Sequence, residues 1–574
     1  MPSLATLFTA LLTTQLTIAA PAPYGKPRDP TLGAVASETA LCSRVGVDLL
    51  KAGGNAADAM VGTVFCVGVV GMYHSGLGGG GFMLVRGSNG TYEFIDFRET
   101  APAAAFQDMY NSTNYGVNAS IFGGLASGVP GELRGLAHLH ENYGQLPWAD
   151  VIAPAIKTAR YGFPVTQDLV NYMDSATAGP GNFLVDNPTW ALDFAPNGTL
   201  VGLNDTITRK RYADTLEIIA LEGPDAFYTG AIAETTIAAL QAENGTMTME
   251  DLRNYTLAIR RPSEITYRGY KLTSCSAPSS GSVALSALKI VEGYTEFDDP
   301  AAVNLTTHRL DEAIRFAYGQ RAELGDPSFV PGLSRYEQLM LSENITAEIR
   351  NKIDDNRTLN VTEYNPDGFE SLETPGTSHV VAADYTGLAI SLTTTVNLLF
   401  GSKLMVPETG VIMNNEMNDF SIPGVSNAFG YVPSPANYVR PGKRPLSSIT
   451  PTIVEHANGT LYFVVGAAGG SRIITSTILN LHNVLDLGLS APEALARPRL
   501  HDQLMPNIVA FEYTYDNGTT AFMRERGHNV TWIASALSSA QALRRLGNGT
   551  FEAAGEPRQF DCEYDLFVKV ERTC

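Results

Sequence analysis

One stretch in the second half of the chain, TPGTSHVVAADYTGLAISLTTTVN (residues 374–397), constrains the fold more than any other. It predicts a tight β-hairpin that begins with a hydroxyl residue directly after a Pro-Gly pair. With the hairpin centred on Thr386, antiparallel pairing places Thr377 opposite Thr395. The period of two puts Ser391 and Thr393 on the face of these threonines, and it assigns the other, buried face to Leu388, Ile390 and Leu392. The plain alternative is a hydroxyl-lined strand face without chemistry.

Thr377 has no evident histidine or aspartate partner at the local spacing of a catalytic triad, so its own amine is the candidate base. A cut between Gly376 and Thr377 would leave a nucleophilic hydroxyl and a free α-amine on one residue. Such an amine titrates near 7.7–8.0, close to working pH, and accepts the hydroxyl proton without a histidine. The same hydroxyl could make the cut by attacking the carbonyl of Gly376 in an N-to-O acyl shift.

A second stretch, TLYFVVGAAGGSRIITSTILNLHNVL, supplies a candidate oxyanion hole. It predicts a strand, then Gly469-Gly470, then a helix for which Ser471 is a good N-cap. Backbone N–H groups at such a junction point toward a developing negative charge, aided by the helix terminus. A tight Gly-Gly turn without this role is the alternative.

The rest of the chain alternates helices and strands. The segment SETALCSRVGVDLLKAGGNAADAMVGTVFCVGVV predicts two helices joined at AGGN, where Gly54 or Asn55 takes the left-handed cap. Two strands, GFMLVRG and TYEFIDFRE, follow, and the region from about 130 to 260 is mainly helical. The polar segment from about 350 to 376 predicts an exposed loop that tolerates a chain break.

Composition limits the classes of function. The 574 residues carry a net charge of −20, and 44% are hydrophobic and 17% charged, as in an ordinary globular protein. The acidic balance, with no Lys/Arg-rich run, argues against a nucleic-acid partner.

Two motifs that could indicate a cofactor or a metal do not fit their context. GLGGGG is not a dinucleotide fingerprint because it follows a helix and opens a strand. His138 and His140 lie two apart on a helix and cannot chelate together, so we expect neither a metal nor a cofactor.

The N-terminus and the sequons indicate the secretory pathway. Residues 1–20 have the length and cleavage-site character of a signal peptide, and a signal anchor is the alternative. About fifteen Asn-x-Ser/Thr sequons follow, more than chance supplies, and they favour a secreted eukaryotic glycoprotein. Five cysteines in an oxidising compartment suggest one or two disulfides.

Several motifs, in order, resemble those of the γ-glutamyltransferase family (γ-glutamyl transpeptidase, glutathione hydrolase). They are GGNAADAMV, GLGGGGFMLV, DFRETAP and GVPGELRGL in the first part, and ETPGTSHV, TTTVNLLFGS, NNEMNDFS, RPGKRPLSSITPTIV, VVGAAGG and RPRLHDQLMPN in the second. The resemblance extends from about residue 30 to the end, and it indicates a fungal member of this family. It implies an α+β fold of the N-terminal-nucleophile hydrolase class, an αββα sandwich of two antiparallel sheets between helix layers. It also implies a large subunit, 21–376, and a small subunit, 377–574, which form one fold and stay together as a heterodimer.

The same resemblance implies roles for individual residues. Thr377 matches the nucleophile, Thr395 the hydroxyl that orients it, and Gly469 and Gly470 the oxyanion donors. The substrate carboxylate would be bound by Arg98, Ser447 and Ser448, and its ammonium by Asn397, Glu416 and Asp419. Glu416 and Asp419 are three apart, which puts both acids on the same side of a helical turn.

The cysteines and the lid loop match the sequence pattern of the family less completely. Cys42 and Cys66 match the disulfide pair of the large subunit. Cys562 and Cys574 are close in sequence and are a second possible pair, with Cys275 free. Where bacterial members often carry a lid tyrosine, this chain offers Phe429, which leaves the polar contact of the lid open.

The reaction implied is attack on the γ-glutamyl amide of glutathione or a related compound. The resulting acyl-enzyme is resolved by water or by an amino acid or dipeptide acceptor, without a cofactor. Two alternatives remain. One is a related acylase acting on another amide with the same threonine chemistry, and the other is a processed but inactive extracellular binding protein.

Overall fold

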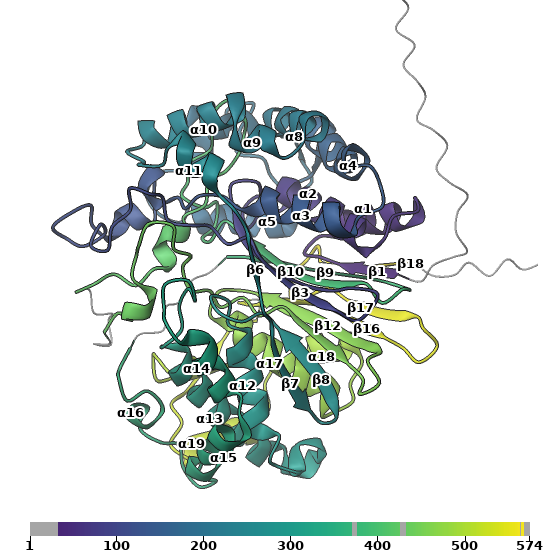
Figure 1. Ribbon diagram of the computed structural model, residues 1–574, viewed down its shortest axis with the longest axis vertical. Helices are drawn as coiled ribbons and strands as arrows, with labels where there is room; N and C mark the ends of the chain where they lie inside the picture. The colour runs from purple at the N-terminus through teal and green to yellow at the C-terminus, as the bar shows by residue number, and fades with distance from the viewer. Residues whose placement is uncertain (1–32, 370–375, 425–431, 536, 563, 568–574) are drawn as a thin grey trace, which may run out of the picture.

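Two antiparallel sheets stacked face to face form the centre of the molecule, and a helix layer covers each outer side (Figure 1). This computed structural model describes residues 33–369, 376–424, 432–535, 537–562 and, as backbone, 564–567. The seven-stranded sheet has the order β18-β1-β9-β10-β2-β3-β6, and the six-stranded sheet has the order β17-β16-β12-β11-β8-β7. The expected αββα sandwich is therefore confirmed.

The predicted hairpin forms the middle of the seven-stranded sheet. Strands β9 (Ser378–Asp384) and β10 (Ala389–Thr395) pair antiparallel, and Thr394 lies opposite Ser378. This register confirms the pairing centred on Thr386. One part of the prediction is incomplete, because both faces of the hairpin are buried rather than one. The second sheet stacks on the hydroxyl face, where the Ser391 hydroxyl donates to the carbonyl of Val465 at 3.1 Å.

The other strands of this sheet come mainly from the first part of the chain. They are β1 (Gly33–Ala36), β2 (Gly80–Arg86), β3 (Tyr92–Asp96), β6 (Ala258–Arg260) and β18 (Tyr564–Phe567). The second sheet consists of β7 (Ser263–Tyr267), β8 (Tyr270–Ser274), β11 (Thr452–Glu455), β12 (Leu461–Ala468), β16 (Ser539–Arg545) and β17 (Phe551–Ala554). Each sheet thus contains strands from both sides of the Gly376–Thr377 bond, so neither part has a complete sandwich of its own.

The first two helices pack directly on the seven-stranded sheet. Helix α1 (Ala40–Lys51) is joined by a disulfide from Cys42 to Cys66 in α2 (Ala56–Val70), which confirms the expected pair. Asn55 is the N-cap of α2, and Gly53, with φ of +99°, adopts the positive-φ conformation. The prediction of Gly54 or Asn55 for that position was wrong, because the side chain of Asn55 is used to cap the next helix instead.

The remaining helices of this layer follow in the region expected to be helical. They are α3 (Glu132–Tyr143), α4 (Trp148–Tyr161), α5 (Gln167–Ala176), α6 (Phe183–Asp186), α7 (Pro188–Phe194), α8 (Lys210–Glu222), α9 (Asp225–Tyr228), α10 (Gly230–Ala242) and α11 (Met249–Asn254). Short strands β4 (Phe163–Pro164) and β5 (Thr206–Ile207) pair between them.

The second helix layer covers the outer face of the six-stranded sheet. It consists of α12 (Gly281–Val291), α13 (Val303–Arg321), α14 (Leu333–Met340), α15 (Glu343–Lys352), α16 (Val361–Tyr364), α17 (Arg472–Leu485), α18 (Ala491–Ala496) and α19 (Asn517–Glu525). A small sheet of β13 (Leu500–His501), β14 (Val509–Glu512) and β15 (Val530–Ile533) completes this side.

Some predictions concern residues that are not described. The signal peptide (1–20), Phe429 and Cys574 all lie outside the described residues. Cys562 is described as a thiol, and Cys275 is a buried thiol. Within the described ranges, no helix combines the length and apolar character needed to cross a bilayer.

Candidate active site

Thr377 lies directly before β9, which begins at Ser378. Only 5% of its surface is exposed. The ladder pairs Ser378 with Thr394, so the next pair of the same register is Thr377 with Thr395. Both predicted threonines therefore lie at the same end of the hairpin.

The bond before Thr377 has an unusual local geometry. The hydroxyl of Thr377 donates to the carbonyl oxygen of Gly376, the residue whose carbonyl carbon it would have to attack. Gly376 has φ of +111°, which favours glycine, and a Cβ there would lie 2.1 Å from the carbonyl oxygen of Asn397. The structure therefore holds the hydroxyl against the peptide bond that the sequence analysis predicted to be cut.

The nearest histidine does not serve Thr377. His379 lies two residues along β9, and its Nδ1 is 2.8 Å from the hydroxyl oxygen of Thr393. Its Nε2 is 3.3 Å from the hydroxyl oxygen of Ser391, and burial lowers the pKa of the imidazole to about 3. Both ring nitrogens are thus occupied by other hydroxyls, which leaves the α-amine of Thr377 as the local base after a cut.

Thr395 and Asn397 form the other side of this end of the hairpin. The backbone N–H of Asn397 donates to the Thr395 hydroxyl oxygen at 2.7 Å. Asn397 has φ of +72°, a conformation that asparagine tolerates better than most residues, and its side-chain amide donates to the carbonyl of Asn415 at 3.0 Å. The loop after β10 therefore fixes Thr395 and turns toward the segment that carries the two acids.

Arg98, Glu416 and Asp419 form a buried charged cluster beside this end of the hairpin. Arg98 follows β3, and the two acids bound the 3₁₀ helix η5 (Glu416–Asp419), as the spacing of three predicted. The Arg98 guanidinium donates to one carboxylate oxygen of each acid. Arg98 is buried, with only 1% of the residue exposed.

Two carboxylate oxygens in the cluster have no hydrogen-bond partner among the described residues. They are Oε2 of Glu416 and Oδ1 of Asp419. Burial raises the pKa of Asp419, while the Arg98 guanidinium opposes that shift. Buried polar oxygens without partners are costly, so this pair is a ready acceptor for a cationic group such as a substrate ammonium.

Ser447 and Ser448 lie in the segment before β11, and both are nearly buried. The hydroxyl of Ser448 accepts from the Arg321 guanidinium at 3.0 Å. The hydroxyl oxygen of Ser447 accepts from the backbone N–H of Ile449 at 3.2 Å, which leaves its own O–H to donate. These two hydroxyls are suited to bind a carboxylate, as the resemblance implied.

Gly469 and Gly470 join β12 to α17, as predicted. Their φ values are +120° and +61°, and a Cβ on Gly469 would lie 2.6 Å from the carbonyl oxygen of Leu537. Ser471 is the N-cap of α17 by position, but its side chain makes no capping hydrogen bond. That detail of the prediction was wrong, and the glycines alone shape the junction.

Helix α13 connects this junction with the serine segment. The Tyr318 hydroxyl donates to the carbonyl of Ser471 at 2.6 Å, and Arg321, one turn later, donates to Ser448. Neither residue was predicted from the sequence, because nothing in the local sequence of a helix shows which distant loops its side chains contact.

Glu99, the neighbour of Arg98, was also missed. It is fully buried, and neither carboxylate oxygen has a hydrogen-bond partner among the described residues. Burial raises its pKa to about 8, although the Arg98 guanidinium opposes the shift. The folded protein therefore keeps Glu99 neutral over a pH range in which an exposed glutamate is ionised.

We expect Glu99→Gln to make stability less dependent on pH. The folded pKa lies above the ordinary value of 4.5, so the stabilisation is complete below that value and is lost as the pH rises through about 8. Glutamine resembles the neutral form and removes this proton linkage. Unfolding free energies from urea titrations between about pH 5 and 8 should fall less steeply in the variant than in the wild type.

The matched control is Glu243→Gln, the same change at an exposed position. It should keep the wild-type slope. Equal slopes for wild type and Glu99→Gln would contradict the raised pKa.

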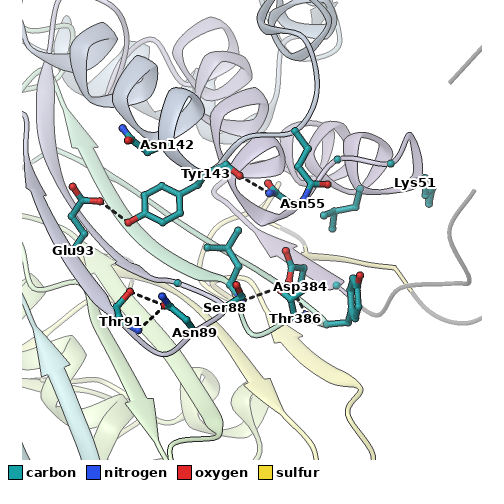
Figure 2. Close-up of a pocket in the computed structure, with 18 residues that line it drawn as sticks. Lys51, Asn55, Ser88, Asn89, Thr91, Glu93, Asn142, Tyr143, Asp384 and Thr386 are labelled. Atoms are coloured by element: carbon teal, nitrogen blue, oxygen red, sulfur yellow. Dashed lines mark hydrogen bonds between the residues drawn. The ribbon is translucent and has the colours of Figure 1, made fainter. Parts of the chain in front are cut away.

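A separate cavity of about 550 Å³ lies at the opposite end of the hairpin, around the turn at Asp384 and Thr386 (Figure 2). Asn89, the first residue of a sequon, lines it, and the Tyr143 hydroxyl donates across it to Glu93 at 2.6 Å. Strand β9 separates this cavity from Thr377 by its full length, so the cavity is not part of the site.

The family of the chain follows from its match to a protein-family model. A family model described as Gamma-glutamyltranspeptidase matches residues 42–563, which include every site residue discussed above. The chain belongs to the γ-glutamyltranspeptidase family. The resemblance stated from the motifs is thereby confirmed, and with it the class of N-terminal-nucleophile hydrolases.

Individual relatives agree with this placement. The glutathione hydrolase proenzyme of Arthroderma benhamiae is 56% identical over 551 residues, covering 94% of this chain and 93% of the relative. A glutathione hydrolase of Aspergillus flavus is 53% identical over 529 residues, covering 92% of this chain and 88% of the relative. The chain is thus an enzyme of the fungal type within the family.

Two solved structures share the fold. The cephalosporin acylase of Bacillus halodurans has a TM-score of 0.82 at 26% identity and covers 97% of this chain and 99% of its own. The γ-glutamyltranspeptidase of Helicobacter pylori has a TM-score of 0.54 at 29% identity and covers 60% of this chain and 96% of its own.

Proposed function

We propose that the chain cuts itself between Gly376 and Thr377 and then acts as a glutathione hydrolase and γ-glutamyl transpeptidase. The observation that carries the proposal is the Thr377 hydroxyl held against the carbonyl of Gly376. Attack on that carbonyl would give an ester, and water would release a large subunit, 21–376, and a small subunit, 377–574. The two stay associated because each sheet of the sandwich contains strands of both.

After the cut, the new α-amine of Thr377 takes the proton of its own hydroxyl as the oxygen attacks the γ-glutamyl carbonyl carbon. A C–O bond forms, and the negative charge on the carbonyl oxygen is met by the backbone N–H groups of Gly469 and Gly470. When the C–N bond breaks, the amine leaves with the proton held by Thr377. Thr395 orients the nucleophile from the opposite strand.

The charged cluster recognises the γ-glutamyl head. Its α-carboxylate is bound by Arg98 together with the hydroxyls of Ser447 and Ser448. Its α-ammonium is bound by Asn397, Glu416 and Asp419, where the unpartnered carboxylate oxygens lie. A zwitterion thus inserts between the guanidinium and the two acids, which pair with one another in the free protein.

The γ-glutamyl ester is then resolved by water, which yields glutamate, or by the amine of an amino acid or dipeptide, which yields a new γ-glutamyl peptide. Glutathione as the donor is supported by the names of the two fungal relatives. The likeness to a structure titled cephalosporin acylase keeps a second candidate, hydrolysis of a different amide by the same threonine. The cluster of Arg98 and two acids favours the zwitterionic substrate. An inactive binding protein is disfavoured because every proposed site residue is in place.

We also propose that the protein enters the secretory pathway, since the sequons and residues 1–20 support it. A disulfide between Cys42 and Cys66 agrees with an oxidising compartment.

The function is tested by steady-state kinetics with glutathione and a dipeptide acceptor. We expect release of cysteinylglycine, and parallel double-reciprocal lines as the acceptor is varied, because a covalent intermediate separates the two half-reactions. A cephalosporin-type amide without the α-ammonium group is the control substrate and should react far more slowly. Faster turnover of that amide than of glutathione would overturn the assignment in favour of the acylase.

A further inference from the structure

Three buried side chains with metal-ligating atoms meet where α13 packs beside α19. His308 and Glu312 lie on one face of α13, four residues apart, and His528 follows α19. All three are buried, and their ligand atoms lie within 4.8 Å of one another. Nδ1 of His308 is 2.8 Å from Nε2 of His528, and that Nε2 is 3.8 Å from Oε1 of Glu312.

The second nitrogen of His308 indicates where its hydrogen lies. Nε2 is 3.0 Å from the backbone carbonyl oxygen of Asp354, which can only accept. The hydrogen of a neutral His308 is therefore on Nε2. Its Nδ1 then carries a lone pair, and that lone pair faces His528.

The hydrogen of His528 is less firmly placed. Its Nδ1 lies 3.0 Å from Oδ2 of Asp311. The contact is close but poorly aligned, since neither atom has a well-directed hydrogen bond. No hydrogen bond therefore fixes the tautomer of His528. With its hydrogen on Nδ1, Nε2 carries a lone pair that a metal could bind, and with its hydrogen on Nε2, the ring donates to Nδ1 of His308 at 2.8 Å.

Nδ1 of His308 and Nε2 of His528 face each other at 2.8 Å, with a carboxylate oxygen of Glu312 beside them. Either one hydrogen or a metal ion can join the two nitrogens. The surroundings are rich in acids, because Asp311, Glu312 and Asp502 are all fully buried, and the buried guanidinium among them, Arg315, is bonded to Asp502 at 2.7 Å.

Two hydroxyl groups also hold the Glu312 carboxylate in place. The Tyr364 hydroxyl donates to its Oε2 at 2.6 Å, and the Thr358 hydroxyl donates to its Oε1 at 2.7 Å. A histidine ligand usually donates its other ring N–H to a carboxylate or a backbone carbonyl, and here Asp311 and Asp354 occupy those places. Both the inner ligands and their supports are therefore present.

We propose that His308, His528 and Glu312 bind a divalent transition metal, for which Zn²⁺ is the best match. Two neutral imidazoles and one carboxylate are a ligand set that zinc prefers, with a water available for the fourth position. This proposal departs from the expectation of no metal, which rested on the absence of a local ligand motif. His308 and His528 are 220 residues apart in the chain, so no local motif contains both.

The site would connect the two proposed subunits. His308, Glu312 and the 354–364 segment lie before the Gly376–Thr377 bond, and His528 lies after it. In Figure 1, α13, α15, α16 and α19 gather at the end of the molecule farthest from the first helix layer. The backbone N–H of Thr358 donates to the carbonyl of Arg526 at 2.7 Å, so the two segments already adjoin there. The metal would link two subunits only if the proposed cut occurs, whereas metal binding itself does not depend on the cut.

The test is the metal content of the full-length protein, purified without a polyhistidine tag and dialysed after exposure to Zn²⁺. We expect about one equivalent of zinc per chain in the wild type and in the uncut Thr377→Ala chain. His308→Gln should lose the metal, whereas His138→Gln, which changes a histidine paired with Glu93, should retain it. Equal zinc in His308→Gln and the wild type would overturn the assignment.

A second measurement remains informative if His308→Gln does not fold. Wild-type protein stripped by a chelator should melt at a lower temperature than the untreated protein, and added Zn²⁺ should restore the melting temperature. Stripped protein that binds no zinc and melts unchanged would mean that a proton, and not a metal, is shared by the two rings. Because fragments and zinc are measured separately, an uncut wild type that binds zinc would contradict only the proposed cut.

Discussion

Replacing Thr377 by alanine is expected to leave the protein as one uncut chain with no detectable γ-glutamyl transfer. The hydroxyl that lies against the carbonyl of Gly376 is then absent, so neither the N-to-O shift nor the later acyl-enzyme can form. Loss of the nucleophile in an enzyme that uses covalent catalysis lowers kcat by about 10⁴-fold or more. Denaturing electrophoresis after deglycosylation and an assay with a γ-glutamyl anilide measure both effects.

Thr377→Ser is the matched control, because it keeps the hydroxyl and the amine and removes one methyl group. It should still be cut, and it should retain activity well above that of the alanine variant. A Thr377→Ala protein that is cut at the same bond would show that another group performs the cleavage.

Asp419→Asn is expected to separate cleavage from substrate recognition. The change keeps the shape of the side chain but removes the negative charge that faces Arg98 and, as proposed, the substrate ammonium. Truncating one member of a buried charge pair costs about 2–5 kcal/mol, so kcat/KM for γ-glutamyl amides should fall by about 10²- to 10³-fold. Cleavage into two fragments should still occur, since the Gly376–Thr377 bond does not require the substrate site.

Asp108→Asn makes the same chemical change at an exposed position and should leave kcat/KM unchanged. The fall for Asp419→Asn should be much smaller with an amide that lacks the α-ammonium group. An equal fall for both substrates would mean that Asp419 supports the structure and does not bind the amine.

Local pattern predicted the elements that depend on neighbouring residues. The register of the hairpin followed from its symmetry about Thr386, and the 3₁₀ turn that aligns Glu416 with Asp419 followed from their spacing. The position of Gly469 and Gly470 followed from the change of a strand pattern to a helix pattern. Each of these is decided within a few residues of chain.

What the sequence could not predict depends on contacts between distant segments. The burial of the hydroxyl face of β10 requires the second sheet. The hydrogen bond from Arg321 to Ser448 requires α13 to end next to the segment that contains Ser447 and Ser448. Asn55 caps a helix instead of adopting the left-handed conformation because Asp58 completes a capping box with it. The pairing of His308 with His528 has no local signal.

The central claim, that Thr377 becomes a free N-terminal nucleophile, is tested most directly by the intact mass and N-terminal sequence of the purified, deglycosylated wild-type protein. The account predicts two fragments, the smaller of which begins at Thr377. One uncut chain with full activity, or a cut at any other bond, would contradict it.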